Sequence, residues 1–507
     1  MKRQFRRLSA CLAGLVLCAL LAPVLTVPAS AAAPSDVPAG FWAEEDIRRC
    51  VEQGYFYLEG GSLFGVGKEM TRAEFVVVLC RFFGWKPTIP PRVVYEDVSD
   101  DAWYAGAVEI AYREGAITDQ NGGFRPDGLI TRSEAASMLV RALGYSTIAG
   151  LVQDFPHPFQ DVRANSGYIS MVYGLGLMDG TSVTVFSPND TITREHAAVI
   201  LMRLYDKIHS GGGSRTGLIS SAEDLPGLKG YESVSISAAH LVYNGAPQIS
   251  PSLEDGELEE IRDLARTSGA RQLLHVSGGP YQLREGGAAE MADVLLEAVK
   301  DGKYDGLTLE ISGLTTTPQR KELTAVVEAV RQGLGEKLLY IIVEAPAWKG
   351  AISGYDYAAL GETADRVILR VGSPAGSSAN GTPTSPPEPL EEVYYALSRM
   401  RGLVDAGKLS LMVSASGTAW EDDEAAEPLT GTEIQKLLED PDTRTYYSGR
   451  YASAYSQLES PKSTLTVWYL NGPAIQERVR LARLFGVEQL CLSELSGVMA
   501  ETAEAMP

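Results

Sequence analysis

The sequence predicts two architectures in one chain, three mainly helical repeats followed by a (β/α)8 barrel of the α/β class. In the first half, one pattern is written three times about sixty residues apart, with Thr-Arg at 71–72, 131–132 and 193–194. In the second half, short apolar runs alternate with stretches of helical length and period, which favours a parallel sheet closed by helices. Between the halves, Ser210 to Ser214 is glycine- and serine-rich, as flexible linkers are.

Residues 1–33 are predicted to be a secretory signal peptide. Four Lys or Arg residues precede an apolar run from Leu8 to Leu25, and Ala29-Ser-Ala31 supplies the small residues of a cleavage site. No later run approaches the length of a membrane span. The formal net charge is −21, and removing these four cations, with no anion in the segment, leaves −25. This sign disfavours nucleic-acid binding and favours an exported, solvated protein.

Each repeat has the same order of features. An Asp-Val pair and an aromatic residue come first, then a helical stretch ending in Gly, a loop containing Phe, and a second helix opened by Thr-Arg. We therefore expect repeats at 34–88, 89–150 and 151–208, a linker at 209–216 and the barrel at 217–507.

The second helix of each repeat is expected to start at the Thr. Thr71 with Glu74, and Thr131 with Glu134, have the spacing of a capping box, in which each side chain accepts the other residue's amide. The third copy departs from this pattern, because His196 stands at the Glu position.

An Arg in the first turn of each second helix needs an explanation. A cation there opposes the helix dipole and costs a few tenths of a kcal/mol, roughly. Its recurrence indicates compensation, either by an anionic ligand between repeats or by the Asp of a neighbouring repeat, and both can hold. The arginines are Arg72, Arg132 and Arg194, and the aspartates are Asp36, Asp97 and Asp161.

Over roughly residues 34–208 the pattern resembles the S-layer homology (SLH) family. The resemblance rests on the Asp-Val pairs, the Thr-Arg pairs, Phe124-x-Pro126 and Phe186-x-Pro188. It implies a trimer-like bundle of three repeats on the bacterial cell wall, bound to anionic, often pyruvylated, secondary cell-wall polysaccharide. The polysaccharide-binding residues that it implies are Trp42, Arg72, Asp97, Trp103, Arg132, Asp161 and Arg194.

Eight apolar runs are the predicted barrel strands. No run upstream of the first of them fits a strand well. The runs are Val234 to Tyr243, Arg271 to Gly279, Tyr304 to Ser312, Leu338 to Pro346, Arg366 to Gly372, Leu409 to Gly417, Leu465 to Tyr469 and Gln489 to Leu495.

The phrases within roughly 271–497, such as LLHVSGG and YDGLTLEISGL, follow an order that resembles glycoside hydrolase family 18. The likeness is greatest to its branch of spore-cortex and peptidoglycan hydrolases. In that family the fourth strand reads DGxDxDxE, and the last Glu protonates the glycosidic oxygen. Here Asp305 and the next Gly match, but Thr308, Glu310 and Ser312 occupy the three acidic positions. A serine hydroxyl has no pKa suited to a general acid near neutral pH.

Other family positions are also changed. The Met-x-Tyr-Asp strand appears as Leu369-Arg-Val-Gly372, Ser416 stands for a tyrosine, and Ser493 for the tryptophan under the sugar. The resemblance therefore implies a degenerate active site with no assigned catalytic residue. Residues that would still bind glycan at the barrel mouth are Glu310, Trp348, Trp420, Trp468 and Tyr469. For Trp468 the alternative is packing beneath a loop.

Three hypotheses remain. The favoured one is a wall-anchored protein whose barrel does not hydrolyse glycan and serves glycan binding or structure. The second is an active peptidoglycan or chitin-type hydrolase with relocated acids, for which Glu344 is a candidate. The third is a purely structural envelope component. The five Cys and five His show no metal-ligand spacing, so we expect no metal or cofactor. Cys50 and Cys80 are expected to be buried thiols, with a disulfide as the alternative.

Overall fold

The computed structural model describes residues 34–87, 94–118, 123–155, 157–346, 354–372, 386–422, 424–425 and 427–506. The chain divides into two compact units, one of residues 1–68 with 193–199 and the other of residues 69–192 with 200–507. The predicted signal peptide and Trp348 lie outside the described residues.

In the first unit, helix α2 (Glu44–Glu52) and the start of α8 (Arg194–His209) pack around a small aromatic core. The rings of Phe56 and Phe64 lie 5.3 Å apart, and both are buried. The Sγ of Cys50 lies 3.6 Å from the backbone oxygen of Ala198. Cys50, Cys80 and Cys491 are all buried free thiols, so the alternative of a disulfide is wrong for these residues.

The other repeat helices belong to the second unit. They are α3 (Arg72–Phe82), α4 (Ala105–Arg113), α5 (Arg132–Ala142), α6 (Ser146–Leu151) and α7 (Ser166–Gly174). Both capping boxes form, at Thr71 with Glu74 and at Thr131 with Glu134. In the third copy, the hydroxyl of Thr193 instead lies 2.8 Å from Nδ1 of His196.

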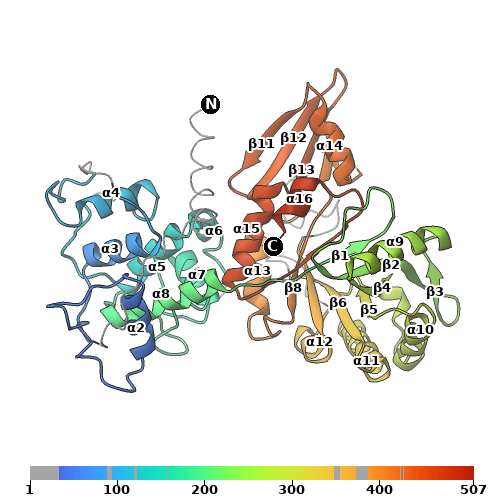
Figure 1. The fold of residues 1–507 in the computed structure, drawn as a ribbon, viewed down its shortest axis with the longest axis horizontal. Helices are drawn as coiled ribbons and strands as arrows, with labels where there is room; N and C mark the ends of the chain where they lie inside the picture. The colour runs from blue at the N-terminus through green and yellow to red at the C-terminus, as the bar shows by residue number, and fades with distance from the viewer. Residues whose placement is uncertain are drawn as a thin grey trace. The chain divides into compact units, whose positions relative to one another are not determined.

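The barrel has eight parallel strands, and the predicted (β/α)8 fold is confirmed. Strand β1 pairs with both β2 and β14, so the sheet closes on itself (Figure 1). A short strand, β3 (Pro247–Pro251), pairs with the end of β2 in the antiparallel direction. The barrel strands are β1 (Arg215–Ile219), β2 (Tyr231–Tyr243), β4 (Arg271–Gly278), β5 (Gly306–Ile311), β6 (Leu338–Glu344), β7 (Arg366–Arg370), β8 (Leu409–Val413) and β14 (Gln489–Leu492).

Two predictions about the strands are corrected. The first barrel strand is β1, which begins at Arg215, inside the segment predicted as linker. The run from Leu465 to Tyr469 is not a barrel strand, because it lies in a second, antiparallel sheet. The helices that connect the barrel strands (Figure 1) are α9 (Asp255–Ser268), α10 (Ala288–Asp301), α11 (Thr317–Leu334), α12 (Tyr357–Thr363), α13 (Leu390–Met400) and α15 (Gly472–Leu484). Helix α16 (Ala500–Ala505) follows the last strand.

The second sheet is an insertion between β8 and α15, so it leaves the barrel at the carboxyl end of a strand. Its strands pair in the order β10-β9-β13-β12-β11. One face packs on α14 (Gly431–Glu439) through residues such as Ile434, Val467 and Tyr469. The strands are β9 (Thr418–Glu421), β10 (Glu424–Ala425), β11 (Arg444–Ser448), β12 (Ser453–Glu459) and β13 (Thr464–Tyr469).

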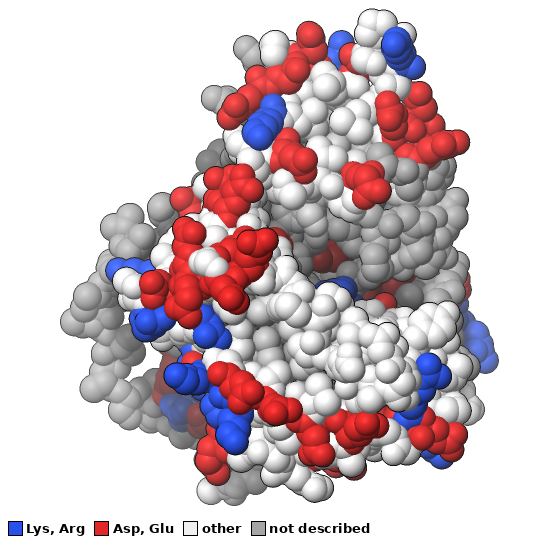
Figure 2. Space-filling model, turned by 90° about the vertical axis from the view of Figure 1, so that its right-hand side faces the viewer, with Lys and Arg blue, Asp and Glu red and all other residues white. Residues whose placement is uncertain are grey.

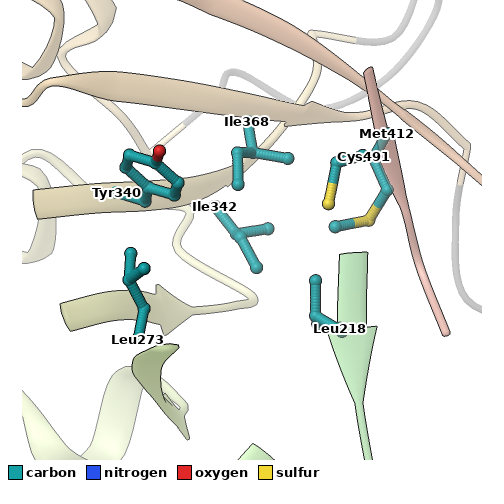
Figure 3. Close-up of a cluster of buried hydrophobic side chains, with 7 residues drawn as sticks. All are labelled: Leu218, Leu273, Tyr340, Ile342, Ile368, Met412 and Cys491. Carbon is teal, nitrogen blue, oxygen red and sulfur yellow. The ribbon is translucent and has the colours of Figure 1, made fainter. Parts of the chain in front are cut away.

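Alternate residues of the barrel strands point inward and fill the interior. One cluster is mostly apolar (Figure 3) and consists of Leu218, Leu273, Tyr340, Ile342, Ile368, Met412 and Cys491. A polar pair accompanies it, since the hydroxyls of Ser235 and Thr308 are 2.7 Å apart. Two residues further along the same strands, the inward positions are Ser237 and Glu310, at the carboxyl ends where barrels place their sites.

Candidate functional site: the barrel mouth and the repeat arginines

At the barrel mouth, Glu310 is held by an ion pair. The guanidinium of Arg370, at the end of β7, contacts both carboxylate oxygens, with Nη2 3.0 Å from Oε2 and Nη1 against Oε1. Ser312 donates its hydroxyl to Oε1 at 3.1 Å. The side chain of Glu310 is buried, with a relative exposure of 7%.

These contacts keep Glu310 ionised. Burial alone would raise the pKa of this carboxyl, but the hydrogen bond from His275 and the charge of Arg370 lower it to about 2. A carboxylate with this pKa holds no proton to give at neutral pH. Glu310 is therefore held ionised, by His275 first and by Arg370 second.

The mouth also contains a short hydrogen-bonded chain. His275, on β4, lies with Nε2 3.2 Å from Oε2 of Glu310 and with Nδ1 2.8 Å from Oγ of Ser237 on β2. His275 is 5% exposed, whereas Ser237 is partly exposed. The sequence predicted the strand that contains His275 but gave that residue no role, and it gave none to Ser237. The alternation of inward positions was the signal available for both.

Two other carboxylates lie near the carboxyl ends of the strands, and both already accept hydrogen bonds from backbone amides. Glu344 accepts the amide of Gly313 at 3.1 Å and lies 3.4 Å from the hydroxyl of Tyr355. Glu388 accepts the amide of Ser414 at 2.7 Å, lies 3.6 Å from Nε of the fully buried Arg478, and is itself only 4% exposed. Burial raises the pKa of Glu388 to about 7. No second carboxylate joins Glu310 in the hydrogen bonds of the described residues.

The aromatic residues predicted to bind glycan lie on the inserted sheet. Trp420 and Trp468 are on one face, at 8% and 7% exposure, and neither indole N–H has a hydrogen-bond partner. Tyr469 is on the opposite face, in the core against α14. The ring of Trp468 lies 4.5 Å from that of Tyr455. As described, these three side chains are packed, and they do not form an open platform.

In the repeats, the three arginines make equivalent contacts. Each donates Nε to the backbone carbonyl of a Phe in another repeat and lies over that Phe ring. Arg72 reaches Phe124 at 2.8 Å, and Arg132 reaches Phe186 at 2.8 Å. In the first unit, Arg194 reaches Phe64 at 2.6 Å.

Each aspartate accepts the backbone amide of the same Phe. Asp97 accepts from Phe124 at 2.8 Å, Asp161 from Phe186 at 2.9 Å, and Asp36 from Phe64 at 2.7 Å. The predicted Arg–Asp partnership is thus indirect, because the two side chains hold the amide and the carbonyl of one residue. We call this arrangement the Phe clamp. It gives every arginine a structural partner, and burial lowers the pKa of Arg72 and of Arg132.

The two repeat tryptophans are exposed, and the third copy has none. Trp42 and Trp103 are 57% and 67% exposed, and the ring of Trp42 lies 5.4 Å from that of His196. Six residues after its Asp, the third copy has Gly167 instead. A Cβ at Gly167 would come within 1.8 Å of the oxygen of Ala149 in α6. In the third copy, helix α6 thus packs closely against the backbone that replaces a Trp.

The family model of the S-layer homology domain matches residues 94–136 and 158–198, within the second and third predicted repeats. This chain carries SLH domains. An S-layer protein of Bacillus thuringiensis subsp. finitimus is 28% identical over 195 residues, which are 38% of this chain and 24% of that protein. The chain thus spans about a quarter of that relative's length. SLH domains and S-layer relatives mark a secreted, cell-surface protein of the bacterial envelope.

Solved structures resemble the barrel. A chitinase from Chromobacterium violaceum aligns over 58% of this chain and 98% of its own, with a TM-score of 0.50 and 15% identity. This likeness shows the fold. A spore cortex-lytic enzyme from Bacillus megaterium aligns over 67% of this chain and 81% of its own, with a TM-score of 0.49 and 12% identity.

The surface carries many acidic side chains. Figure 2 shows Asp and Glu spread over one face, with a hollow between the inserted sheet and the barrel where acidic and basic atoms are visible. Among the described residues, no helix has the length and hydropathy needed to span a membrane. In the same residues, no group of three His, Cys, Asp or Glu side chains is arranged to hold a metal ion.

Proposed function

We propose that this protein is anchored through its SLH repeats to secondary cell-wall polysaccharide and displays a barrel that does not cleave glycosidic bonds. The observation that carries the second part is the ion pair of Arg370 with Glu310. It supports a mouth without a proton donor at the family's position, where Ser312 stands. Glu344 and Glu388 both accept backbone amides. Glu388 has a pKa raised to about 7, which would suit a general acid, but its side chain is only 4% exposed and is closed to a glycosidic oxygen.

For the anchor, the exposed tryptophans support polysaccharide contact better than the three arginines of the Phe clamps do, because Arg72 and Arg194 are buried and Arg132 is only partly exposed. Trp42 and Trp103 present large apolar faces of the kind that stack on sugar rings. The Phe clamps support a three-fold arrangement, since they link the first repeat to the second, the second to the third and the third to the first. Trp42, with His196 beside it, and Trp103 mark two surfaces for the polysaccharide, and α6 occupies the corresponding place in the third copy.

For the barrel, a structural role is the second candidate function. Trp420, Trp468 and Tyr469 are packed, and the carboxylate of Glu310 is paired with Arg370. Glycan binding instead requires Trp420 and Trp468 to become accessible, and their unpartnered indole N–H groups are the donors that a sugar hydroxyl would satisfy.

Two assays test the proposal on residues 34–507. In the first, release of reducing ends from peptidoglycan and N-acetylglucosamine oligomers should stay at the buffer level. Release that Glu310→Gln abolishes would make Glu310 the acid and overturn the proposal. In the second, cell wall that keeps its polysaccharide should retain the protein, and stripped peptidoglycan should not. Equal retention on both would contradict the anchor.

A further inference from the structure

The barrel mouth contains an arrangement that the family resemblance does not explain. Ser237, His275 and Glu310 come from the neighbouring strands β2, β4 and β5 and form one continuous hydrogen-bonded chain. A hydroxyl, an imidazole and a carboxylate in this order are the parts of an activated nucleophile.

The strand pairing places Ser237 against His275. Strand β2 pairs with β4 in parallel, but the register shifts between Ile236 and Ala239. Ile236 pairs with Leu274 and Ala239 with Val276, so two residues of β2 lie opposite His275 alone. Such bulges re-aim side chains and are common beside active sites.

The chemistry of Glu310 fixes the tautomer of His275. An ionised carboxylate only accepts hydrogen bonds, so the neutral imidazole must donate from Nε2. Its Nδ1 then carries the lone pair and accepts the Ser237 hydroxyl at 2.8 Å. A general base needs this geometry toward its nucleophile.

The matched comparison is Ser235, the preceding inward serine of the same strand. Ser235 is fully buried, and its hydroxyl lies 2.7 Å from that of Thr308, which is no base. Ser237 is partly exposed, while His275 and Glu310 behind it are buried. Of these two serines, only Ser237 combines access with an adjacent base.

We propose that Ser237, His275 and Glu310 form a nucleophilic site that cleaves small acyl esters. Ser237 Oγ forms a bond to the acyl carbon while its proton passes to Nδ1 of His275. The bond from the acyl carbon to the alcohol oxygen breaks, and His275 returns the proton to that oxygen. Water then attacks the acyl-serine with its proton passing to His275, and the carboxylic acid leaves as Ser237 recovers its proton.

Esters are the substrate class because amides need stronger oxyanion support. The cation at the mouth is Arg370, whose side chain is 27% exposed but already paired with Glu310. This positive charge also weakens the stabilisation of the imidazolium by the carboxylate, so the site favours esters with good leaving groups. The proposal is independent of whether the barrel binds glycan.

A fluorophosphonate probe and p-nitrophenyl acetate test the site on residues 34–507. The probe should label Ser237, as mapped by peptide mass spectrometry, and labelling should disappear in Ser237→Ala. The kcat/KM for the ester should fall at least tenfold in that variant and stay unchanged in Ser235→Ala. Absence of labelling in the folded wild-type protein, or equal ester rates with and without the Ser237 hydroxyl, would overturn the proposal.

Glu310 would be a positioning residue, and its variant has a separate readout. The charged groups that face His275 are Glu310 from β5 and, beyond it, Arg370 from β7. Glu310→Gln removes the charge that stabilises the imidazolium, so the pH midpoint of labelling should move to lower pH. A lower labelling rate with an unchanged midpoint would assign Glu310 to structure alone and contradict this part of the proposal.

Discussion

Arg370 spans both oxygens of Glu310 across the barrel mouth, from the end of β7 to the end of β5. The pair places a permanent cation beside a carboxylate that it helps to keep ionised. Removing Arg370 leaves the buried carboxylate of Glu310 without its cation, which typically costs about 3–5 kcal/mol. The Arg370–Glu310 pair therefore determines the charge at the barrel mouth and also contributes to the stability of the barrel.

The first prediction concerns acid unfolding. Glu310 has a pKa lowered to about 2 in the folded protein, against 4.5 as its ordinary value. Its stabilising contribution is present above pH 4.5 and is lost as the pH falls towards 2, because the unfolded chain binds the proton first. In Glu310→Gln, the free energy of unfolding should lose this pH dependence, which is roughly 3 kcal/mol between pH 5 and 2. Chemical denaturation between pH 2 and 5 measures it, and an unchanged slope would contradict it.

The second prediction has the opposite sign. Burial raises the pKa of Glu388 to about 7 from 4.5. The folded protein thus holds a proton that the unfolded chain has lost, and this contribution is present below pH 4.5 and lost as the pH rises through 7. Glu388→Gln should remove the decline between pH 5 and 8, as measured by thermal unfolding. The control is Glu260→Gln at an exposed position of α9, and this variant should keep the decline in stability between pH 5 and 8.

The third prediction separates anchoring from stability in the repeats. Trp42→Ala with Trp103→Ala should abolish retention on cell wall carrying polysaccharide, because it removes the exposed stacking faces, and should shift Tm by less than about 3 °C. The control is Tyr281→Ala, since Tyr281 is 81% exposed in the barrel domain. Retention of the double variant at the wild-type level would count against the tryptophans.

The fourth prediction concerns the Phe clamp. Arg72→Ala leaves the carbonyl of Phe124 without its donor and removes the ion pair with Glu134, so we expect a loss of about 2–4 kcal/mol. Urea unfolding followed by circular dichroism measures it. The exposed Arg266→Ala on α9, whose carboxylate partners are also exposed, is the control and should change stability by less than about 0.5 kcal/mol. Similar small losses in both would exclude a structural role for Arg72.

The fifth prediction tests the close packing of α6. Gly167→Ala should cost several kcal/mol, on the order of 3, because its Cβ would overlap the oxygen of Ala149. Gly256→Ala is the matched control, since its Cβ would meet nothing within 4 Å in helix α9. That change should be neutral or slightly stabilising. Equal Tm values for the two variants would show that α6 moves aside.

Most of the fold could be predicted from the sequence because period and alternation are local properties. The repeats and seven barrel strands follow from them. Strand β1 was missed because five residues beside a Gly-rich segment give little pattern. Leu465 to Tyr469 was placed wrongly because an apolar run looks alike in either sheet.

The site was harder to predict because its contacts depend on barrel closure. Sequence reasoning identified Ser312 and Glu310 and included Arg370 in the altered strand Leu369 to Gly372, without giving Arg370 a role. It could not show that Arg370 neutralises Glu310, because β5 and β7 are separated by β6 and meet only across the interior. Ser237 was equally hidden, since the register shift that aims it at His275 is a property of the paired strands.

The pairing of β1 with β14 has a consequence for export. The barrel cannot close until Leu490 of β14 pairs with Arg215 of β1. Since β14 is the last strand of the domain, closure requires nearly the whole domain to have been exported. Outside the cell, no ATP-driven chaperone assists the chain during this interval. Until then, the edges of β1 and β8 that pair with β14 are open to proteases and to other chains. Secretion speed and extracellular chaperones, rather than the stability of the finished barrel, would then set how much protein reaches the wall.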